Sequence, residues 1–290
     1  RNAIAHDIRS PLSTFLSWLC ALFFFSYGVG AQSLSYTKAD SLFCLQVLDS
    51  LKHLQTPDAG ERMVQVACLF LDKPYVAATL EGEPETLVVN FRELDCTTLV
   101  ESVLALSQPV SSFADYTEAL RGLRYRKGEV RYTERLHYIA DWMYENGKRG
   151  LVKDITPELP GSEPLPLALS FMSSHSESYP ALKGHPERVV RMQEVESAVN
   201  ARSGYAYLPK ERMGEVEKFI RNGDIIGFVT TIKGLDVTHL GIAYWATAER
   251  LTFIHASSSA RKVIVNPDSL ESYLKRQKSC RGIWVIRPNS

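Results

Sequence analysis

The stretch NFRELDCTTLVESVLALS, residues 90–107, decides how the rest of the sequence is interpreted. Apolar residues recur at helical spacing from Leu99 onwards, which predicts a helix that begins at Cys96, with Asp95 at its N-cap. A helix start places the thiol beside unpaired backbone N–H groups and the positive end of the helix dipole. Because that environment lowers a thiol pKa, Cys96 is a candidate nucleophile. The alternative is that Cys96 is a small buried side chain, as most free cysteines are.

The composition excludes several functional classes. The chain has 290 residues, 45% of them hydrophobic, which is enough for one large domain or two small ones. Its formal net charge of +0 gives no bulk attraction to nucleic acid or to an acidic membrane surface. The seven histidines are scattered, and neither a CxxC pair nor an HExxH motif occurs. We therefore expect neither a metal nor another cofactor.

The N-terminal residues have the pattern of a secretory signal peptide. Arg1 and Arg9 precede the apolar run at residues 15–27, and small residues ending at Ala31 follow it. The run is short for a membrane span. We expect residues 1–31 to be removed and the remaining chain to be exported to the periplasm, without stable membrane insertion. An uncleaved anchor helix is the alternative.

Beyond this segment the cysteines are too few for a disulfide scaffold. Cys44 and Cys68 fall on apolar faces of predicted helices, so we expect both in the core. A disulfide between them stays open, because the chain is expected to be exported. The remaining cysteines are Cys96 and Cys280.

The periodicity changes from helical to extended near residue 223, which predicts an α+β fold. Helices are expected over residues 35–54, 59–71, 112–123, 132–146, 187–202 and 209–222. Strands are expected over residues 224–232, 239–246, 251–255, 262–265 and 282–287, with a helix over 268–278. We expect a single domain over residues 32–290, with a helical part at 35–222 and a sheet part at 223–290.

Two histidines in the sheet part supply what a nucleophilic thiol needs, namely a base and a partner that orients the base. His239 starts one predicted strand, and His255 ends the next. A hairpin would bring the two imidazoles side by side on one face. The alternative is that each is an ordinary core or surface histidine.

Four short motifs occur in an order that resembles the NlpC-type cell-wall hydrolases, which are papain-like cysteine amidases and peptidases. They are DCTT at 95–98, GDIIGF at 223–228, HLGIA at 239–243 and IHAS at 254–257. The resemblance implies a nucleophile at the start of a helix that packs on an antiparallel sheet.

Residue by residue, the resemblance implies Cys96 as nucleophile, His239 as base and His255 as third member of a triad. It also implies support of the oxyanion by Tyr75, in the sequence Lys-Pro-Tyr, and by the helix start at Asp95.

Within that superfamily, three stretches are similar to the N-acetylmuramoyl-L-alanine amidase-like branch. They are NFRELDCTTLVE, YTERLHYIADW and GLDVTHLG. The resemblance implies a large helical insertion, at about 108–208, and cleavage of the amide between N-acetylmuramic acid and L-alanine in muropeptides. Two alternatives stay open. One is an endopeptidase that cuts γ-D-glutamyl–diamino acid bonds with the same triad, and the other is a muropeptide-binding protein without catalysis.

We expect the insertion to build the sugar side of the site. Aromatic faces and planar donors suit a pyranose with its acetamido group, so Arg135, His137 and Trp142 are the first candidates. On a helix over 132–146, Arg135, Tyr138 and Trp142 would share a face. The alternative is that Tyr138 and Trp142 belong to the core.

Overall fold

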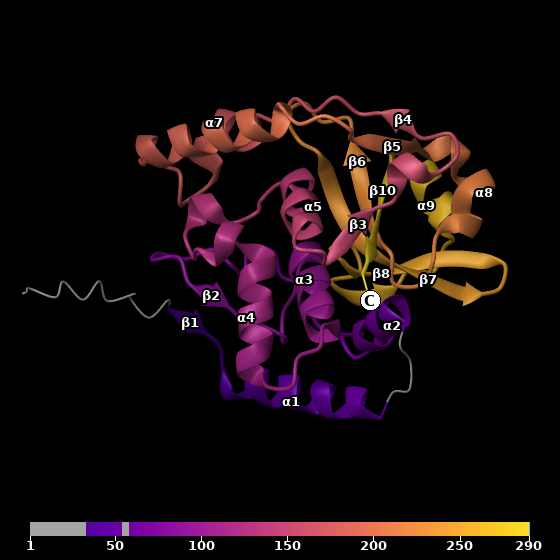
Figure 1. The fold of residues 1–290 in the computed structure, drawn as a ribbon, viewed down its shortest axis with the longest axis horizontal. Helices are drawn as coiled ribbons and strands as arrows, with labels where there is room; N and C mark the ends of the chain where they lie inside the picture. The colour runs from indigo at the N-terminus through magenta and orange to yellow at the C-terminus, as the bar shows by residue number, and fades with distance from the viewer. Residues whose placement is uncertain (1–32, 54–57, 290) are drawn as a thin grey trace, which may run out of the picture. The chain divides into compact units, whose positions relative to one another are not determined.

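The structure is a computed structural model that describes residues 33–53 and 58–289 (Figure 1). The predicted signal peptide, residues 1–31, lies outside the described residues. Helices precede most of the sheet along the chain, and the sheet is antiparallel, so the α+β prediction is confirmed.

The first half of the described chain is mainly helical. Its helices are α1 Lys38–Lys52, α2 Ala59–Cys68, α3 Cys96–Ser107, α4 Phe113–Arg124 and α5 Ile139–Lys148. The central one is α3, which is buried at every position from Thr98 to Ser107. It packs on α2 and α4 and on two sheet strands, so it joins the helical layer to the sheet. Two short strands, β1 Leu34–Ser35 and β2 Leu87–Val88, form a separate parallel pair.

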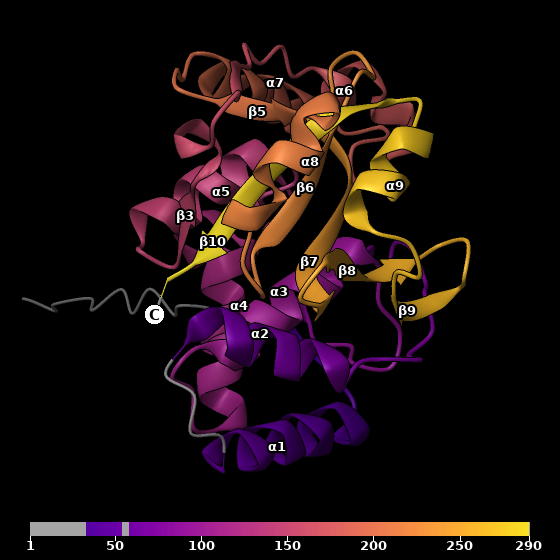
Figure 2. The same cartoon turned by 90° about the vertical axis from the view of Figure 1, so that its right-hand side faces the viewer.

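The main sheet has eight strands among the described residues. They are β3 Val152–Asp154, β4 Glu163–Pro164, β5 Ala206–Pro209, β6 Ile225–Thr230, β7 Val237–Thr247, β8 Arg250–Ser257, β9 Lys262–Val265 and β10 Cys280–Pro288. The order is β4-β5-β10-β6-β7-β8-β9, and β3 pairs with β10. In Figure 2, α2 and α3 lie between α1 and these strands.

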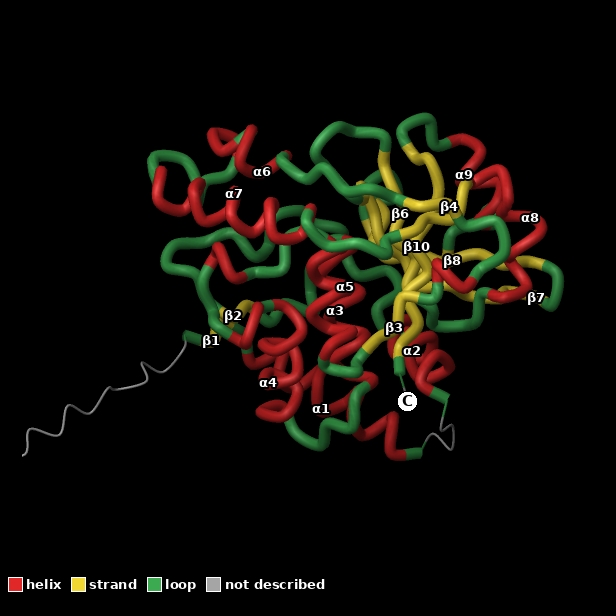
Figure 3. The backbone as a smooth tube through the Cα atoms, turned by 45° about the horizontal axis from the view of Figure 1, so that its top comes forward, coloured by secondary structure: helices red, strands yellow, loops and turns green. Residues whose placement is uncertain are grey.

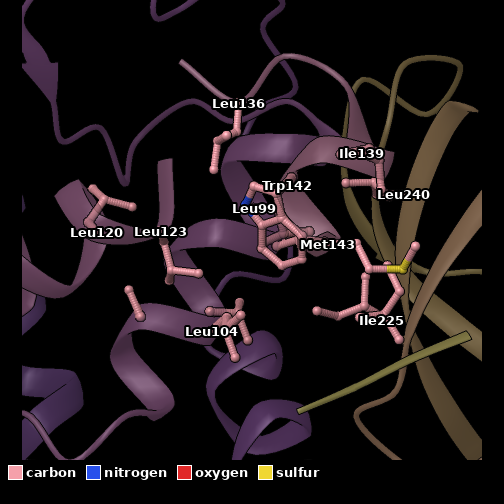
Figure 4. Close-up of a cluster of buried hydrophobic side chains, with 14 of the residues drawn as sticks. Leu99, Leu104, Leu120, Leu123, Leu136, Ile139, Trp142, Met143, Ile225 and Leu240 are labelled. Atoms are coloured by element: carbon pink, nitrogen blue, oxygen red, sulfur yellow. The ribbon is translucent and has the colours of Figure 1, made fainter. Parts of the chain in front are cut away.

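Both faces of the sheet are covered. Alternate residues of β6 enter different cores: Ile225 joins the cluster formed with the helices, and Ile226 joins a second cluster on the other face. Figure 4 shows the first of these, where side chains of α3, α4 and α5 meet Ile225 and Leu240. The second cluster includes Leu270 and Leu274 from α9, Leu270–Arg276. Burial on both faces fixes the strand register and so fixes the ends of the strands.

The segment between α4 and the strand β6 is a mixture of short elements (Figure 3). Its remaining helices are α6 Phe171–Ser174, α7 Pro186–Asn200 and α8 Met213–Val216. The predicted helix over 209–222 was wrong, because α8 is flanked by separate 3-10 turns at Lys210–Arg212 and Glu217–Phe219. The apolar contacts therefore come from the short helix α8, at Met213 and Val216, and from Ile220 after the second turn.

The prediction of one helix over 132–146 was also wrong. Tyr132–Glu134 is a 3-10 turn, Arg135 and Tyr138 have extended backbone, and α5 begins only at Ile139. The helix begins there because the Asp236 carboxylate accepts the Ala140 N–H at 2.8 Å and so caps it from another element. Tertiary contacts have overridden the local periodicity, and the shared face inferred for Arg135, Tyr138 and Trp142 does not exist.

The cysteines agree with prediction only in part. Cys44 is fully buried, as expected, whereas Cys68 is exposed at the end of α2. All four cysteines of the described chain are free, so Cys44 and Cys68 are not bridged.

Candidate functional site

Cys96 is the first residue of α3, as the sequence predicted. Asp95 is the N-cap, and its carboxylate accepts the Thr98 N–H at 2.8 Å. In return the Thr98 hydroxyl accepts the Asp95 N–H at 2.9 Å, which completes a capping box. These reciprocal hydrogen bonds fix the helix start, and with it the position of the thiol.

The thiol lies against strand β7. The backbone N–H of Leu240 favours the charged form of the Cys96 thiol and so acts to lower its pKa, and Leu240 directly follows His239 in the strand. Because α3 packs on both β7 and β8, the helix start and the histidine strands are held in one rigid arrangement.

The two histidines meet as predicted. Nε2 of His239 lies 2.7 Å from Nδ1 of His255, a hydrogen-bonding distance, and the rings are nearly perpendicular at 80°. The pairing of Ile242 with Ile254 in the β7–β8 hairpin sets this contact. His255 is buried, whereas His239 keeps partial exposure.

A single hydrogen lies between these two ring nitrogens. Which nitrogen carries it decides whether His239 can act as a base. If Nδ1 of His239 is to accept a proton from a thiol, Nε2 of His239 must carry a hydrogen and donate it to Nδ1 of His255. A neutral His255 then carries its own hydrogen on Nε2. That nitrogen is buried and has no hydrogen-bond partner among the described residues.

The protonation states differ from the expectation of a thiolate. Burial and, after it, the neighbouring Asp95 carboxylate raise the pKa of Cys96 to about 11, while the Leu240 N–H acts in the opposite direction. Desolvation of the thiol is the largest cause, and the direction is opposite to the lowered pKa expected from the sequence. Burial also lowers the pKa of His239 to about 3 and that of His255 to about 4. The resting site therefore holds a neutral thiol and neutral imidazoles.

Tyr75 lies in the loop before the helix. Its backbone N–H donates to the Arg261 carbonyl at 3.0 Å, and it bridges to Leu94 just ahead of the N-cap. Burial raises the pKa of Tyr75, and the charges of Cys96 and Asp95 act in the same direction. The Tyr75 hydroxyl is therefore neutral at physiological pH and able to donate a hydrogen bond, and its support of the oxyanion stays a prediction.

Two cavities border this group. The larger measures about 690 Å³, and its walls include both histidines, the β8–β9 turn and α9. Hydroxyl and amide side chains predominate, and the only charged lining residues are Asp268 and Arg276, which pair with each other. The smaller cavity, about 150 Å³, is lined by Asp95 and Thr97 on either side of Cys96 and by charged residues of the insertion.

The three residues suggested for sugar binding have different surroundings. Arg135 and His137 line the smaller cavity. The guanidinium of Arg135 already contacts Glu85 and Glu81, each at 2.7 Å, and a ring nitrogen of His137 lies 2.8 Å from the Tyr132 carbonyl. Trp142 is 2% exposed, lies in the core and lines neither cavity (Figure 4).

Sequence reasoning missed Tyr273, which lines the larger cavity from α9. Its ring lies 4.9 Å from that of Phe253 and 6.2 Å from that of His255. The only sequence signal was an aromatic residue in a predicted helix, and such a residue usually belongs to the core.

Within the described ranges, no group of three or more His, Cys, Asp or Glu side chains is placed to hold a metal ion. None of the helices described is long and apolar enough to cross a membrane.

Comparison with known proteins gives one matching family model and several similar solved structures. A family model described as "AmiA-like: N-acetylmuramoyl-L-alanine amidase-like" matches residues 65–283. The crystal structure of an N-acetylmuramoyl-L-alanine amidase from Bacteroides uniformis is similar with 40% identity and a TM-score of 0.74, and the match covers 80% of this chain and 99% of that one. A search of curated proteins gave no match.

Two further structures are similar. A xylanase candidate from Bacteroides fragilis has 41% identity and a TM-score of 0.71, over 77% of this chain and 99% of that one. A Legionella pneumophila protein has 23% identity and a TM-score of 0.69, over 87% and 95% of the two chains, and at that identity it shows the fold alone.

Proposed function

Because the chain belongs to the N-acetylmuramoyl-L-alanine amidase-like family, we propose that it hydrolyses the amide between N-acetylmuramic acid and L-alanine in muropeptides. Peptidoglycan amidase activity is the function of the family, and the dependence on Cys96 is our proposal. The observation that carries it is the 2.7 Å contact between His239 and His255, on the two strands against which the Cys96 helix α3 packs. A helix-start thiol on an antiparallel sheet also favours a papain-like, NlpC-type core.

The neutral resting state determines the first step. The Cys96 sulfur attacks the lactyl carbonyl carbon as its proton passes to Nδ1 of His239. The imidazolium that forms is held by its hydrogen bond to His255. The Cys96 N–H and the Tyr75 hydroxyl stabilise the oxyanion, and the capping box of Asp95 keeps that N–H in place.

The intermediate then collapses. His239 returns the proton to the leaving nitrogen, the C–N bond breaks, and the peptide departs with a free L-alanine amine. Water, deprotonated by His239, attacks the thioester and releases a muramic acid with a free lactyl carboxylate. His239 finally returns a proton to the Cys96 sulfur, so the site is restored without any external reagent.

The structural neighbour named as a xylanase candidate suggests a different chemistry. Most glycosidases use two carboxyl groups that flank the scissile bond. The larger cavity is lined by a single acid, Asp268, which pairs with Arg276. The thiol and the paired imidazoles therefore favour an amidase.

We propose that the protein acts after export, on cell-wall turnover products in the periplasm. Within residues 1–31, positively charged residues, an apolar run and small residues follow one another in that order, which supports export. Intact-mass analysis of the protein from its native host tests the proposal. A start near Gln32 agrees with export and cleavage, and retention of residues 15–27 indicates an anchor instead.

Substitution tests the catalytic roles. We expect Cys96→Ala and His239→Ala each to abolish release of peptide from a disaccharide-tetrapeptide, because nucleophile and base act as a unit. We expect His255→Ala to be damaging but less complete, since His255 only orients the base. Cys68→Ala is the matched control, because Cys68 is an exposed thiol at the end of α2. Full activity in a folded Cys96→Ala protein would end the cysteine mechanism.

A further inference from the structure

The α9 wall of the larger cavity presents a tyrosine in a fixed position. Ser269 caps α9 by accepting the Ser272 N–H, and Tyr273 follows directly. The Tyr273 ring packs edge-on against two phenylalanines, at 4.9 Å from Phe253 and 5.4 Å from Phe228, and it also faces His255 at 6.2 Å. Contacts with three rings restrict its side-chain torsions, so the hydroxyl has a defined place.

Packing explains the ring of Tyr273 but not its hydroxyl. A phenylalanine would make the same three ring contacts. In the part of the chain that the structure describes, the Tyr273 oxygen takes part in no hydrogen bond, although the side chain is only partly exposed. The hydroxyl is therefore open to a molecule in the larger cavity, which Tyr273 lines.

A second polar atom at the same wall lacks a partner. Nε2 of His255 is buried and makes no hydrogen bond to any described residue, and His255 itself is 4% exposed. The two residues face each other across 6.2 Å between ring centroids. A cavity wall with a free hydroxyl and a buried imidazole nitrogen without a partner favours a polar ligand.

Tyr273 lines the same cavity as the proposed base, His239. The charge of Cys96 is close enough to raise the Tyr273 pKa, after the larger effects of burial and of Cys280. Tyr273 is therefore neutral at physiological pH and able to donate its proton.

We propose that Tyr273 is a further substrate-contacting residue, whose hydroxyl donates a hydrogen bond to an oxygen of the muropeptide next to the scissile amide. The inference rests on the proposed function, because it takes the muropeptide as the occupant of the larger cavity. It adds α9, the last helix of the chain, to the elements that hold the substrate.

The test is Tyr273→Phe, which removes the hydroxyl and keeps the ring. We expect kcat/KM on a disaccharide-tetrapeptide to fall about 3- to 10-fold, as for the loss of one hydrogen bond to an uncharged group, with the melting temperature unchanged. Tyr244→Phe is the matched control, since Tyr244 lies on β7 and lines neither cavity. A Tyr273→Phe protein with wild-type kcat and KM would overturn the inference.

A binding measurement separates this inference from the proposed function. Calorimetry of the uncleaved disaccharide-tetrapeptide with Cys96→Ala, with and without Tyr273→Phe, needs no turnover. Weaker binding in the double variant supports the contact, even if the wild-type protein cuts a different bond. Equal binding in the two variants overturns it, and absence of any binding to Cys96→Ala overturns both the inference and the proposed function.

Discussion

The ring nitrogens of His239 and His255 set the protonation state in which the site operates. Histidine in solution has a pKa of about 6.5. Burial lowers the pKa of His239 to about 3 and that of His255 to about 4, so both are neutral across the physiological range. A base must be unprotonated before it can accept the thiol proton, and lowering its pKa extends that state toward acid.

We therefore predict that kcat/KM keeps its value as the pH falls from 7 to about 5, and that its acid limb lies near the lowered pKa of the pair rather than near 6.5. A pH–rate profile on a soluble muropeptide checks this, with the enzyme shown to remain folded at each pH. An acid limb centred near 6.5 would show that the histidines titrate normally in the free enzyme.

The raised pKa of the Cys96 thiol leads to a second prediction. Because burial and Asp95 raise the pKa of Cys96 to about 11, only a minute fraction is thiolate at neutral pH. We expect alkylation of Cys96 by iodoacetamide to accelerate about tenfold for each pH unit between 7 and 9. Peptide mapping by mass spectrometry measures the rate at Cys96 alone. A rate that has already levelled off at pH 7 would mean a stable thiolate and would restore the expectation from the helix dipole.

At the scale of elements, prediction succeeded where local chemistry determines structure. The start of α3 was predictable because Asp95 and Thr98 are close in sequence and cap the helix themselves. The start of α5 was not, because its cap is Asp236, far along the chain. The surroundings of Arg135 were hidden for the same reason, since its partners Glu81 and Glu85 come from another loop.

Arg135 links that loop to the insertion. Its guanidinium and the Glu85 carboxylate are each 8% exposed, and the Tyr125 hydroxyl donates to the same carboxylate at 2.6 Å. We predict that Arg135→Ala lowers the free energy of unfolding by about 3–5 kcal/mol, because it leaves a buried carboxylate unpaired. Urea denaturation measures this change.

Arg131→Ala is the matched control for Arg135. Arg131 pairs with Glu129 at the surface, where the two side chains are 65% and 45% exposed. We expect its removal to change stability by less than about 1 kcal/mol. If Arg135→Ala were as stable as Arg131→Ala but failed to cleave muropeptides, Arg135 would be a substrate-binding residue, as first suggested from the sequence.

At the scale of the whole molecule, the prediction of the fold and of the site rested on the order of motifs along the chain. The helix-start cysteine, the two histidine strands and the change from helices to sheet were visible in sequence, and the structure brings His239 and His255 together as expected. Within the insertion, the longer helices α4 and α7 were predicted to within about two residues, whereas the start of α5 was not, since it depends on a long-range contact. Tyr273 was not identified from the sequence, because hydrophobic periodicity does not show which residues line a cavity.

The central claim is that Cys96 breaks the muramoyl–alanine amide. Hydrolysis in water enriched in oxygen-18 tests it most directly, because the label marks the carbonyl that was attacked. We predict one labelled oxygen in the lactyl carboxylate of the released disaccharide, an unlabelled tetrapeptide with a free L-alanine amine, and no products from Cys96→Ala. Label in a peptide carboxylate, or undiminished products from folded Cys96→Ala, would contradict the claim.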